Sequence, residues 1–218
     1  MGVSALVMAK APRPGSVKTR LEPLLGPEGC VALQAELIAV ASRWAAAVAP
    51  GRAYVACGPD AAGPAEVGRH ASPGVELFAD GEGDLGDRLA TATTRVLAVH
   101  PEPLLVVGTD MPLLRAEDAV AAEEALRAGA GAVFGPALDG GYWLVGLNRP
   151  APALFELGED WGGPRVLARS LAAAAELGLG TELLAARRDL DDPDDAAALL
   201  AEHDLPESVA ELLRGTRA

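Results

Sequence analysis

The 218-residue sequence is poor in cysteine, aromatic residues and positive charge, and it has no long apolar run. Its two cysteines, Cys30 and Cys57, are too few for a disulfide scaffold and too far apart for a metal-binding pair, which favours a reducing compartment. The apolar run at residues 3–9 is too short for a signal-peptide core, and no run approaches the roughly 20 apolar residues that span a bilayer. We therefore expect a cytoplasmic protein with no membrane partner.

Basic residues are outnumbered, with 18 Lys and Arg against 31 Asp and Glu, for a net charge of −13. Such an acidic chain is a poor candidate for binding nucleic acid or an anionic membrane surface. Residues 1–21 nevertheless contain Lys10, Arg13, Lys18 and Arg20 and no acid, so this segment carries +4 and the remainder −17. A local basic segment on an acidic chain indicates a site for a small anionic ligand.

Short apolar runs alternate with patterns of three- and four-residue apolar spacing along the chain. We expect strands at residues 3–8, 53–57, 75–79, 103–107, 132–134, 142–147 and 182–186, and helices at 27–48, 85–99, 116–128, 165–177 and 193–202. This alternation predicts an α/β fold, a mostly parallel sheet with helices on both faces. No linker-like break appears, so residues 1–218 are expected to form a single domain. Ligands of such sheets bind beyond the carboxyl ends of the strands.

The loop at residues 11–21 follows the first expected strand and brings Arg13, Lys18 and Arg20 into a small volume, next to Lys10. Phosphate groups require this kind of positive charge, and Arg can bind two phosphate oxygens at once. The loop is not a Walker motif, because Gly15 lies only three residues before Lys18 and the second glycine is missing. A solvated basic loop is the alternative, but the position after the first strand favours phosphate binding.

Residues 81–86 match the GxGxxG pattern of dinucleotide-binding proteins, but we reject that interpretation. The segment lies in the third strand–helix unit, and its acids would repel a pyrophosphate: Asp80, Glu82, Asp84 and Asp87. A tight turn before a helix start stabilised by acids is the simpler explanation. A nicotinamide-dependent oxidoreductase is disfavoured for the same reason. Arg88, just inside the expected helix, is kept as a candidate ligand-binding residue.

Two aspartates at expected strand ends are candidate metal ligands. Asp110 follows an apolar strand and precedes the turn fixed by Pro112, a place where nucleotide-using enzymes hold a Mg²⁺ ion that also binds phosphate oxygens. A capping role is the alternative for Asp110. Asp191, which we favour over Asp189, precedes a helix start at the same sheet edge and is expected to join Asp110 at a Mg²⁺ (or Mn²⁺) ion.

The segment Asp139-Gly140-Gly141-Tyr142 predicts a turn whose glycines allow the backbone to approach a ligand closely. Asp139 is the best candidate for a general base in the sequence. An ordinary hairpin turn of the Asp-Gly type is the alternative.

Five motifs occur in order along the chain: MAKAPRPGSVKTRL, GDLGDRL, GTDMPLL, GPALDGGYWLVGL and RDLDDPDD. Together they resemble, over nearly the whole chain, a bacterial family of small GT-A-fold proteins, described as arsenosugar-biosynthesis-type glycosyltransferases or as a domain of unknown function. The family is related to the phospholactate guanylyltransferases and the molybdenum-cofactor cytidylyl- and guanylyltransferases, within the nucleotide-diphospho-sugar transferase superfamily. The resemblance implies a GT-A-type (Rossmann-like) sheet.

The resemblance also implies residue roles. Lys18 and Arg20 match the phosphate-binding loop, Asp110 and Asp191 the metal ligands, and the turn at residues 139–142 the acceptor-side segment. Asp192 departs from the family pattern by standing where Thr is common, which exchanges one helix cap for another. The segment Asp160-Trp161-Gly162-Gly163 lacks the Trp-Ser-Thr seen in relatives, so the acceptor is expected to differ, with Trp161 beside it.

The resulting hypothesis is a Mg²⁺-dependent transferase that takes a nucleotide or nucleotide-sugar donor and a small-molecule acceptor. Asp110, Asp139 and Lys18 are its expected catalytic residues. Glycosyl transfer is favoured by the family resemblance, whereas the basic first loop suits the triphosphate of a nucleotidyltransferase that releases pyrophosphate. A nucleotide-binding module without turnover ranks third. The sequence carries no signal for the oligomeric state, the nucleobase, the sugar or the acceptor.

Overall fold

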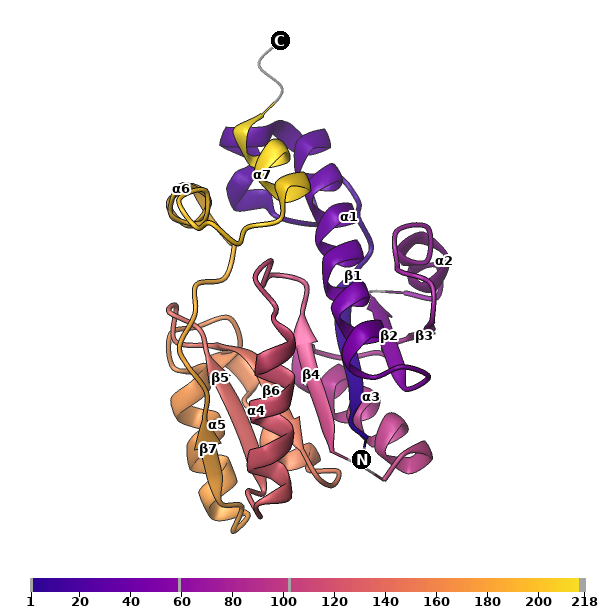
Figure 1. The fold of residues 1–218 in the computed structure, drawn as a ribbon, viewed down its shortest axis with the longest axis vertical. Coiled ribbons are helices and arrows are strands. Elements are labelled where there is room, and N and C mark those ends of the chain that lie inside the picture. The colour runs from indigo at the N-terminus through magenta and orange to yellow at the C-terminus, as the bar shows by residue number, and fades with distance from the viewer. Residues whose placement is uncertain (1, 59, 102, 216–218) are drawn as a thin grey trace.

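The computed structural model describes residues 2–58, 60–101 and 103–215, which form a seven-stranded sheet in the order β3-β2-β1-β4-β6-β5-β7 (Figure 1). The central strands are buried because helices cover both faces of the sheet, whereas the edge strand Thr181–Leu183 is exposed. The strands are β1 (Ser4–Lys10), β2 (Ala53–Gly58), β3 (Val75–Ala79), β4 (Leu104–Gly108), β5 (Ala132–Pro136), β6 (Tyr142–Leu147) and β7 (Thr181–Leu183).

Strands β1 to β4 are parallel to one another, and β5 is parallel to β7. Strand β6 runs antiparallel to both β4 and β5. The reversal follows from the loop between β5 and β6, because residues 137–141 are too few for a crossover and close a hairpin instead, in which Ala137 N–H donates to the Gly141 carbonyl at 3.0 Å. The α/β class and the mostly parallel sheet with helices on both faces are confirmed.

Helices cover both faces of the sheet and produce two cores. Helices α1 (Glu22–Val48), α2 (Gly63–Val67) and α4 (Ala116–Arg127) pack on one face. Helices α3 (Leu85–Val99) and α5 (Val166–Glu176), with the 3₁₀ helix η2 (Pro152–Phe155), pack on the other. The remaining short elements are η1 (Thr19–Leu21), η3 (Gly158–Asp160), α6 (Pro193–Leu199) and α7 (Glu207–Arg214).

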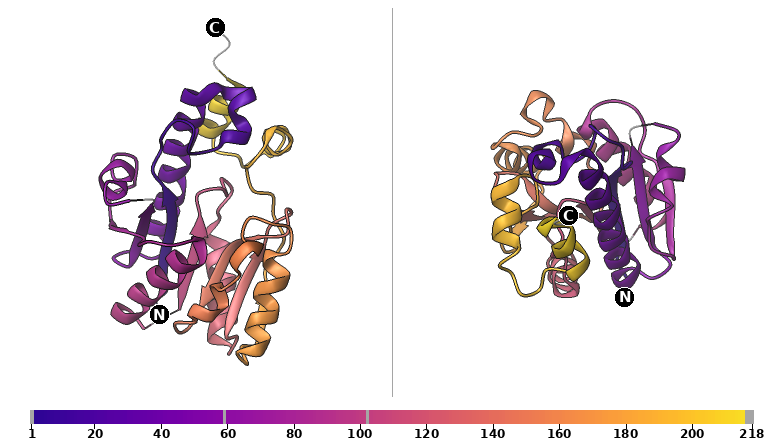
Figure 2. Two further views of the ribbon diagram at one scale, coloured as in Figure 1. Left: turned by 180° about the vertical axis from the view of Figure 1, so that it is seen from behind. Right: turned by 90° about the horizontal axis from the view of Figure 1, so that it is seen from above.

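A third apolar cluster lies beyond the edge of the sheet, where α6 and α7 pack against the first half of α1 (Figure 2). Leu33 and Leu37 of α1 meet Val209 and Leu213 of α7, and all four are buried. Helix α7 was not expected from the sequence, because eight residues give too few turns for a clear periodic pattern. Leu190, fully buried in this cluster, anchors the loop that leads into α6.

Helix α1 differs from expectation in two respects. It has an extra turn before the expected start at residue 27, separated from the rest by a kink at Gly26, whose φ of 70° is accessible mainly to glycine. In addition, the described residues contain one helical segment, Thr19–Val48, that is long and apolar enough to cross a membrane by length and composition alone, where none had been expected. In the fold, Ile38, Ala41 and Ala45 of this helix are fully buried against the sheet.

The carboxyl ends of the parallel strands bring distant loops to one edge. Strand β1 leads into the basic loop, β3 into Asp80, and β4 into Asp110. The late loop joins this edge through Leu190, whose N–H donates to the Asp110 carbonyl at 2.8 Å. The late strand is shorter than expected, ending at Leu183 instead of residue 186, and the chain beyond it makes a single further bridge between Arg187 and Ala137.

Candidate functional site

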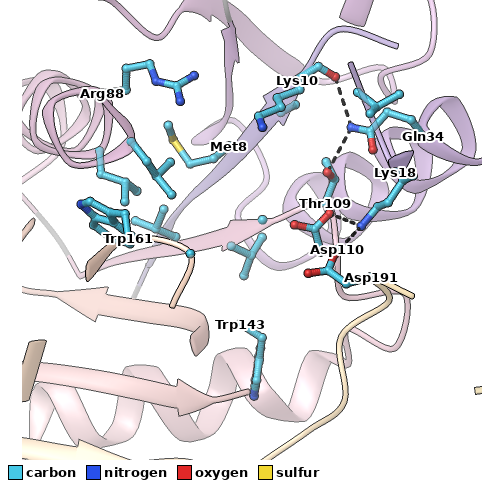
Figure 3. A pocket seen from close by; sticks show the side chains of 18 of the residues that line it. Met8, Lys10, Lys18, Gln34, Arg88, Thr109, Asp110, Trp143, Trp161 and Asp191 are labelled. Atoms are coloured by element: carbon cyan, nitrogen blue, oxygen red, sulfur yellow. Dashed lines mark hydrogen bonds and ion pairs between the residues drawn. The ribbon is translucent and has the colours of Figure 1, made fainter. Parts of the chain in front are cut away.

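A cavity of about 460 Å³ opens at the carboxyl edge of the sheet (Figure 3). Its lining divides by chain position and by charge. The lining residues between 8 and 89 come from β1, the basic loop, α1, α3 and Asp80 after β3, and we call them the basic wall. The lining residues between 106 and 191 come from β4, β6 and the loops near Trp161 and Asp191, and we call them the acidic wall.

Four cations line the basic wall: Lys10, Lys18, Arg20 and Arg88. Among the described lining residues, the acidic wall contributes no cation, but it contributes the three carboxylates Asp110, Asp139 and Asp191, whereas the single carboxylate of the basic wall, Asp80, is paired with Arg88. The charge asymmetry seen along the sequence is therefore reproduced across the width of one cavity.

Lys18 connects the two walls. Its ammonium forms ion pairs with Asp110 and, at 3.2 Å, with Asp191, and it donates to the Leu190 carbonyl at 2.6 Å (Figure 3). Its side chain is only 5% exposed, so these oxygens replace most of its water. The backbone of Lys18 is left-handed, with φ 50°, and Lys18 is the only described non-glycine residue with a positive φ. Such a conformation is strained and persists only where the surroundings enforce it.

The pKa of Lys18 results from opposing effects. Burial lowers the pKa, but the negative charges of Asp110 and Asp191 and their hydrogen bonds outweigh burial, so the pKa lies above its ordinary value. The structure thus brings together three predicted site residues as a charged group, with the ammonium lying between the two carboxylates.

A second carboxylate group overlaps the first. Asp139, Asp189 and Asp191 each present one oxygen, and these oxygens lie within 4.8 Å of one another. Burial, followed by the negative charges of Asp139 and Asp191, raises the pKa of Asp189 to about 6. A divalent cation would relieve this repulsion, and carboxylate oxygens are the donors that Mg²⁺ and Mn²⁺ prefer. Sequence analysis favoured Asp191 over Asp189, but the structure places both aspartates at the site.

Arg88 reaches the cavity from the first turn of α3, where Nη1 pairs with Asp80 at 3.2 Å and Nε donates to the Asp84 carbonyl at 3.2 Å. Asp80 is 3% exposed, and one of its carboxylate oxygens has no hydrogen-bond partner. Burial raises the Asp80 pKa, and Arg88 opposes that shift. Gly58 allows this packing, because a Cβ there would lie 2.6 Å from an Asp80 oxygen.

The other acids of the GxGxxG-like segment are used locally. Asp84 and Asp87 form a reciprocal capping box at the start of α3, with the Asp87 N–H donating to Asp84 at 3.0 Å and the Asp84 N–H to Asp87 at 3.1 Å. The turn and acid-stabilised helix start predicted for this segment are therefore present.

Gln34 is a cavity residue that sequence analysis missed. Its side-chain amide, buried on the inward side of α1, donates to the Lys10 carbonyl at 3.1 Å and to the Thr109 hydroxyl at 3.2 Å. It thereby joins the ends of β1 and β4, from which Lys10 and Asp110 emerge. The sequence feature that could have revealed Gln34 is that it is a polar residue among the regularly spaced apolar residues of this helix, between Leu33 and Leu37.

The acidic wall contains the rings of Tyr142, Trp143 and Trp161, of which Tyr142 and Trp161 are in edge-to-face contact with ring centroids 6.3 Å apart. The Trp161 indole N–H donates to the Phe155 carbonyl at 3.1 Å, which fixes the ring. Burial raises the pKa of Tyr142, and the Ser170 side chain opposes that shift. Tyr142 therefore lines the cavity beside Trp161.

The Asp139 turn depends on its glycines. Gly140 has φ 94°, and a Cβ there would lie 2.2 Å from the Pro164 carbonyl oxygen. The Gly141 N–H donates to the Asp139 carboxylate at 2.8 Å, which orients that side chain. The predicted acceptor-side residues Asp139, Gly140, Gly141 and Tyr142 thus lie on one turn, packed against the segment that follows Trp161.

Arg13 is the one predicted phosphate-binding residue that the structure places outside the cavity lining. Its guanidinium pairs with Glu66 at 2.7 Å and with Asp60 at 2.8 Å, in and near the short helix α2. The hydrogen bonds from Arg13 lower the pKa of Asp60 to about 2. Sequence analysis did not predict α2 and so could not foresee these partners.

The fold is that of nucleotide-utilising transferases and is similar to the nucleotide-diphospho-sugar transferase fold. A crystal structure from Desulfovibrio desulfuricans G20, described as a "putative nucleotide-diphospho-sugar transferase", superposes with a TM-score of 0.85 and 26% identity, over 98% of this chain and 95% of that one. The chain belongs to the family described as "Uncharacterized protein conserved in bacteria (DUF2064)", whose model matches residues 40–163, more than half of its length.

Two more distant solved structures share the fold. One is a cytidylyltransferase from Leptospira borgpetersenii, with a TM-score of 0.54 and 13% identity over 98% of this chain and 92% of that one. The other is Rv0371c from Mycobacterium tuberculosis H37Rv in complex with manganese, with a TM-score of 0.50 and 17% identity over 93% of this chain and all of that one. No curated protein matches this chain in sequence.

Proposed function

We propose that the protein is a divalent-metal-dependent glycosyltransferase that moves a sugar from a nucleoside-diphosphate sugar to a small, uncharged acceptor. The observation that carries this proposal is the division of the cavity into a basic wall and an acidic wall with aromatic rings. The similarity to the Desulfovibrio protein over nearly the whole chain supports the same class.

The basic wall suits the donor. Lys10, Lys18, Arg20 and Arg88 place four cations around one cavity, enough to neutralise a diphosphate and the charge that develops on it as the sugar leaves. Preorganised charges of this kind stabilise a transition state without reorganising water. Lys10 and Arg20 are exposed and free to approach phosphate oxygens, whereas Arg13 has no role in this proposal.

The acidic wall suits a neutral acceptor. A phosphorylated acceptor would meet Asp139 and Asp191 there without a compensating cation from the same wall. A hydroxyl group on an apolar or sugar-like acceptor could instead lie against Trp161 and within reach of the Asp139 carboxylate. We assign Asp139 as the base that accepts the proton of this hydroxyl.

The carboxylates Asp110 and Asp191, with Asp139 and Asp189 close by, fit a Mg²⁺ or Mn²⁺ ion because all of their donors are hard oxygens. When bound, the ion supplies Lewis-acid stabilisation of the donor phosphates. The manganese complex of Rv0371c, a protein of the same fold, is consistent with such an ion.

Nucleotidyl transfer is the second candidate. Four cations exceed what a diphosphate requires and would also suit the triphosphate of a nucleotide donor. The cytidylyltransferase from Leptospira shows that this fold can carry that chemistry.

A turnover screen distinguishes the candidates. Purified protein with Mg²⁺ and a mixed metabolite extract as acceptor is incubated with nucleotide sugars in one series and nucleoside triphosphates in another. The readouts are released nucleoside diphosphate and released pyrophosphate. Asp110→Asn is the inactive control, and Asp204→Asn, at an exposed ion pair with Arg115, is the matched active control.

Release of nucleoside diphosphate that requires Asp110 supports glycosyl transfer. Pyrophosphate release confined to triphosphates would replace it with nucleotidyl transfer. Tight nucleotide binding without either product would overturn both and favour a binding module.

A further inference from the structure

The ammonium of Lys18 lies where the two predicted metal ligands converge. It contacts one oxygen each of Asp110 and Asp191, and the Leu190 carbonyl oxygen supplies a third contact (Figure 3). Three oxygen atoms surround this nearly buried ammonium, as ligand oxygens surround a bound metal ion. The carboxylates are therefore already neutralised by a cation that belongs to the chain.

The ammonium opposes the binding of a divalent ion to these same oxygens. Two positive charges in contact with the same carboxylates repel each other, and the side chain of Lys18, only 5% exposed, has little water to screen that repulsion. Either the ion or the ammonium must leave the carboxylates, unless an anion joins them.

The residue type suits a cation that moves. Of the 18 basic residues in the chain only two are lysines, Lys10 and Lys18, and both line this cavity. Lysine carries a compact charge on a flexible stem, whereas arginine is planar and suited to fixed, two-point contacts. The left-handed backbone of Lys18 is a strained conformation, of the kind that clusters at functional sites.

We propose that Lys18 is a resident cation, which occupies the metal position in the free protein and yields it only when donor phosphates arrive together with the ion. The idea rests on the metal-dependent transferase function proposed above and adds an order of binding to it. The phosphates offer the displaced ammonium a new partner, so metal and phosphate bind cooperatively. Metal alone is excluded, which keeps the free site from binding stray ions.

Manganese binding in the absence of any nucleotide tests this directly. Mn²⁺ affinity is measured by water-proton relaxation for the wild type, Lys18→Met and Lys10→Met, first without phosphate and then with inorganic triphosphate. Lys10→Met is the matched control, because it removes the same charge from the same cavity, at an exposed side chain.

For Mn²⁺ alone, Lys18→Met is expected to bind about tenfold or more tightly than the wild type, and Lys10→Met less than about threefold more tightly. Triphosphate is expected to raise the Mn²⁺ affinity of the wild type strongly and that of Lys18→Met much less. Equal or weaker Mn²⁺ binding by Lys18→Met would overturn the proposal.

A measurement on the unaltered side chain covers the case in which Lys18→Met does not fold. With ¹⁵N-labelled lysine, the protein has only two side-chain ammonium signals, and Lys10→Met assigns them. The Lys18 signal should stay in place with Mg²⁺ alone and shift with Mg²⁺ plus triphosphate. A shift of the same size with Mg²⁺ alone would refute the resident-cation role.

The two proposals fail differently. If Mn²⁺ binds the wild type with triphosphate, but Lys18→Met binds Mn²⁺ alone no more tightly than the wild type does, the resident-cation role fails. The proposed metal-dependent transferase function then stands. If Mn²⁺ binds none of the three proteins under either condition, both proposals fail.

Discussion

The two walls of the cavity are built in different ways. The basic wall follows parallel strands with long crossovers, and its cations stand at the end of β1, on the loop and 3₁₀ turn after it, and at the start of α3. The carboxylates of the acidic wall have three origins: Asp110 follows the parallel strand β4, Asp139 stands on the tight turn into the antiparallel strand β6, where the Gly141 N–H holds it, and Asp191 stands on the late loop. Positive charge is therefore presented on long, adjustable side chains, and negative charge on short, oriented ones.

This difference matches the partners that we propose for each wall. Phosphate chains vary in position and suit flexible cations, whereas a metal ion and a reacting hydroxyl require oxygens held within narrow limits. If the comparison is correct, changes to the basic wall should alter donor affinity, and changes to the acidic wall should alter turnover, folding of the turn, or acceptor affinity.

The largest effect is expected for Asp110→Asn. This change keeps the shape of the side chain but removes the charge that pairs with Lys18 and, in our proposal, holds the metal. We expect kcat/KM to fall by about 10²- to 10³-fold, the range typical of losing one preorganised electrostatic contact. Steady-state kinetics in parallel with Asp204→Asn provides the measurement, and a fall of less than tenfold would remove Asp110 from the catalytic group.

Gly140→Ala should come next, as a test of how rigid the acidic wall is. The new Cβ would face the Pro164 carbonyl oxygen at 2.2 Å on a backbone with φ 94°. We expect the free energy of unfolding to fall by about 1–3 kcal/mol. Urea denaturation measures this against Gly180→Ala, where a Cβ meets no atom within 4 Å and φ is not positive. Equal stability of the two variants would mean that the turn tolerates a side chain.

A pair of substitutions should separate the walls. Trp161→Ala is expected to raise the acceptor KM about tenfold with little change in the donor KM, because it removes the fixed ring that the acceptor contacts in our proposal. Arg88→Met is expected to do the reverse, about tenfold on the donor. The donor KM and the acceptor KM of both variants are measured with each substrate varied in turn. Parallel changes in both constants would show that the walls do not act separately.

The smallest effect is expected for Arg13→Met. Arg13 pairs with Asp60 and Glu66 away from the cavity lining, so donor affinity should change less than about twofold, while Arg20→Met weakens it about tenfold. Calorimetric titration with nucleoside diphosphate compares the two. If Arg13→Met lost as much affinity for nucleoside diphosphate as Arg20→Met, Arg13 would belong to the phosphate-binding residues after all.

The part of the cavity at the ends of strands β1 to β4 was the easier part to predict from the sequence. Strands β1 to β4 are continuous apolar runs, so their ends could be read within about two residues, and parallel order then brings Lys18 and Asp110 to one edge. The helix start at Asp84 was also recognisable from its acids.

What could not be predicted depends on contacts between distant segments. Arg13 was misplaced because its partner Glu66 stands on a helix too short to leave a periodic signal. Gln34 was overlooked because only the fold shows that it spans the ends of β1 and β4. The convergence of Asp189 with Asp139 likewise depends on how the late loop crosses the hairpin. Charged residues and turns can be identified from the local sequence, whereas contacts between distant residues cannot.

The burial of Leu190 has a consequence for the far end of the chain. Leu190 lies in the cluster between α1 and α7, while its neighbour Asp191 lines the cavity, so the packing of the last helix determines where that carboxylate stands. A chain shortened before residue 207 would retain every cavity residue and lose the surface that braces one of them. No described residue of α7 lines the cavity, but the packing of α7 supports the loop that carries Asp191. We therefore expect a tag or truncation at α7 to displace the predicted metal ligand Asp191.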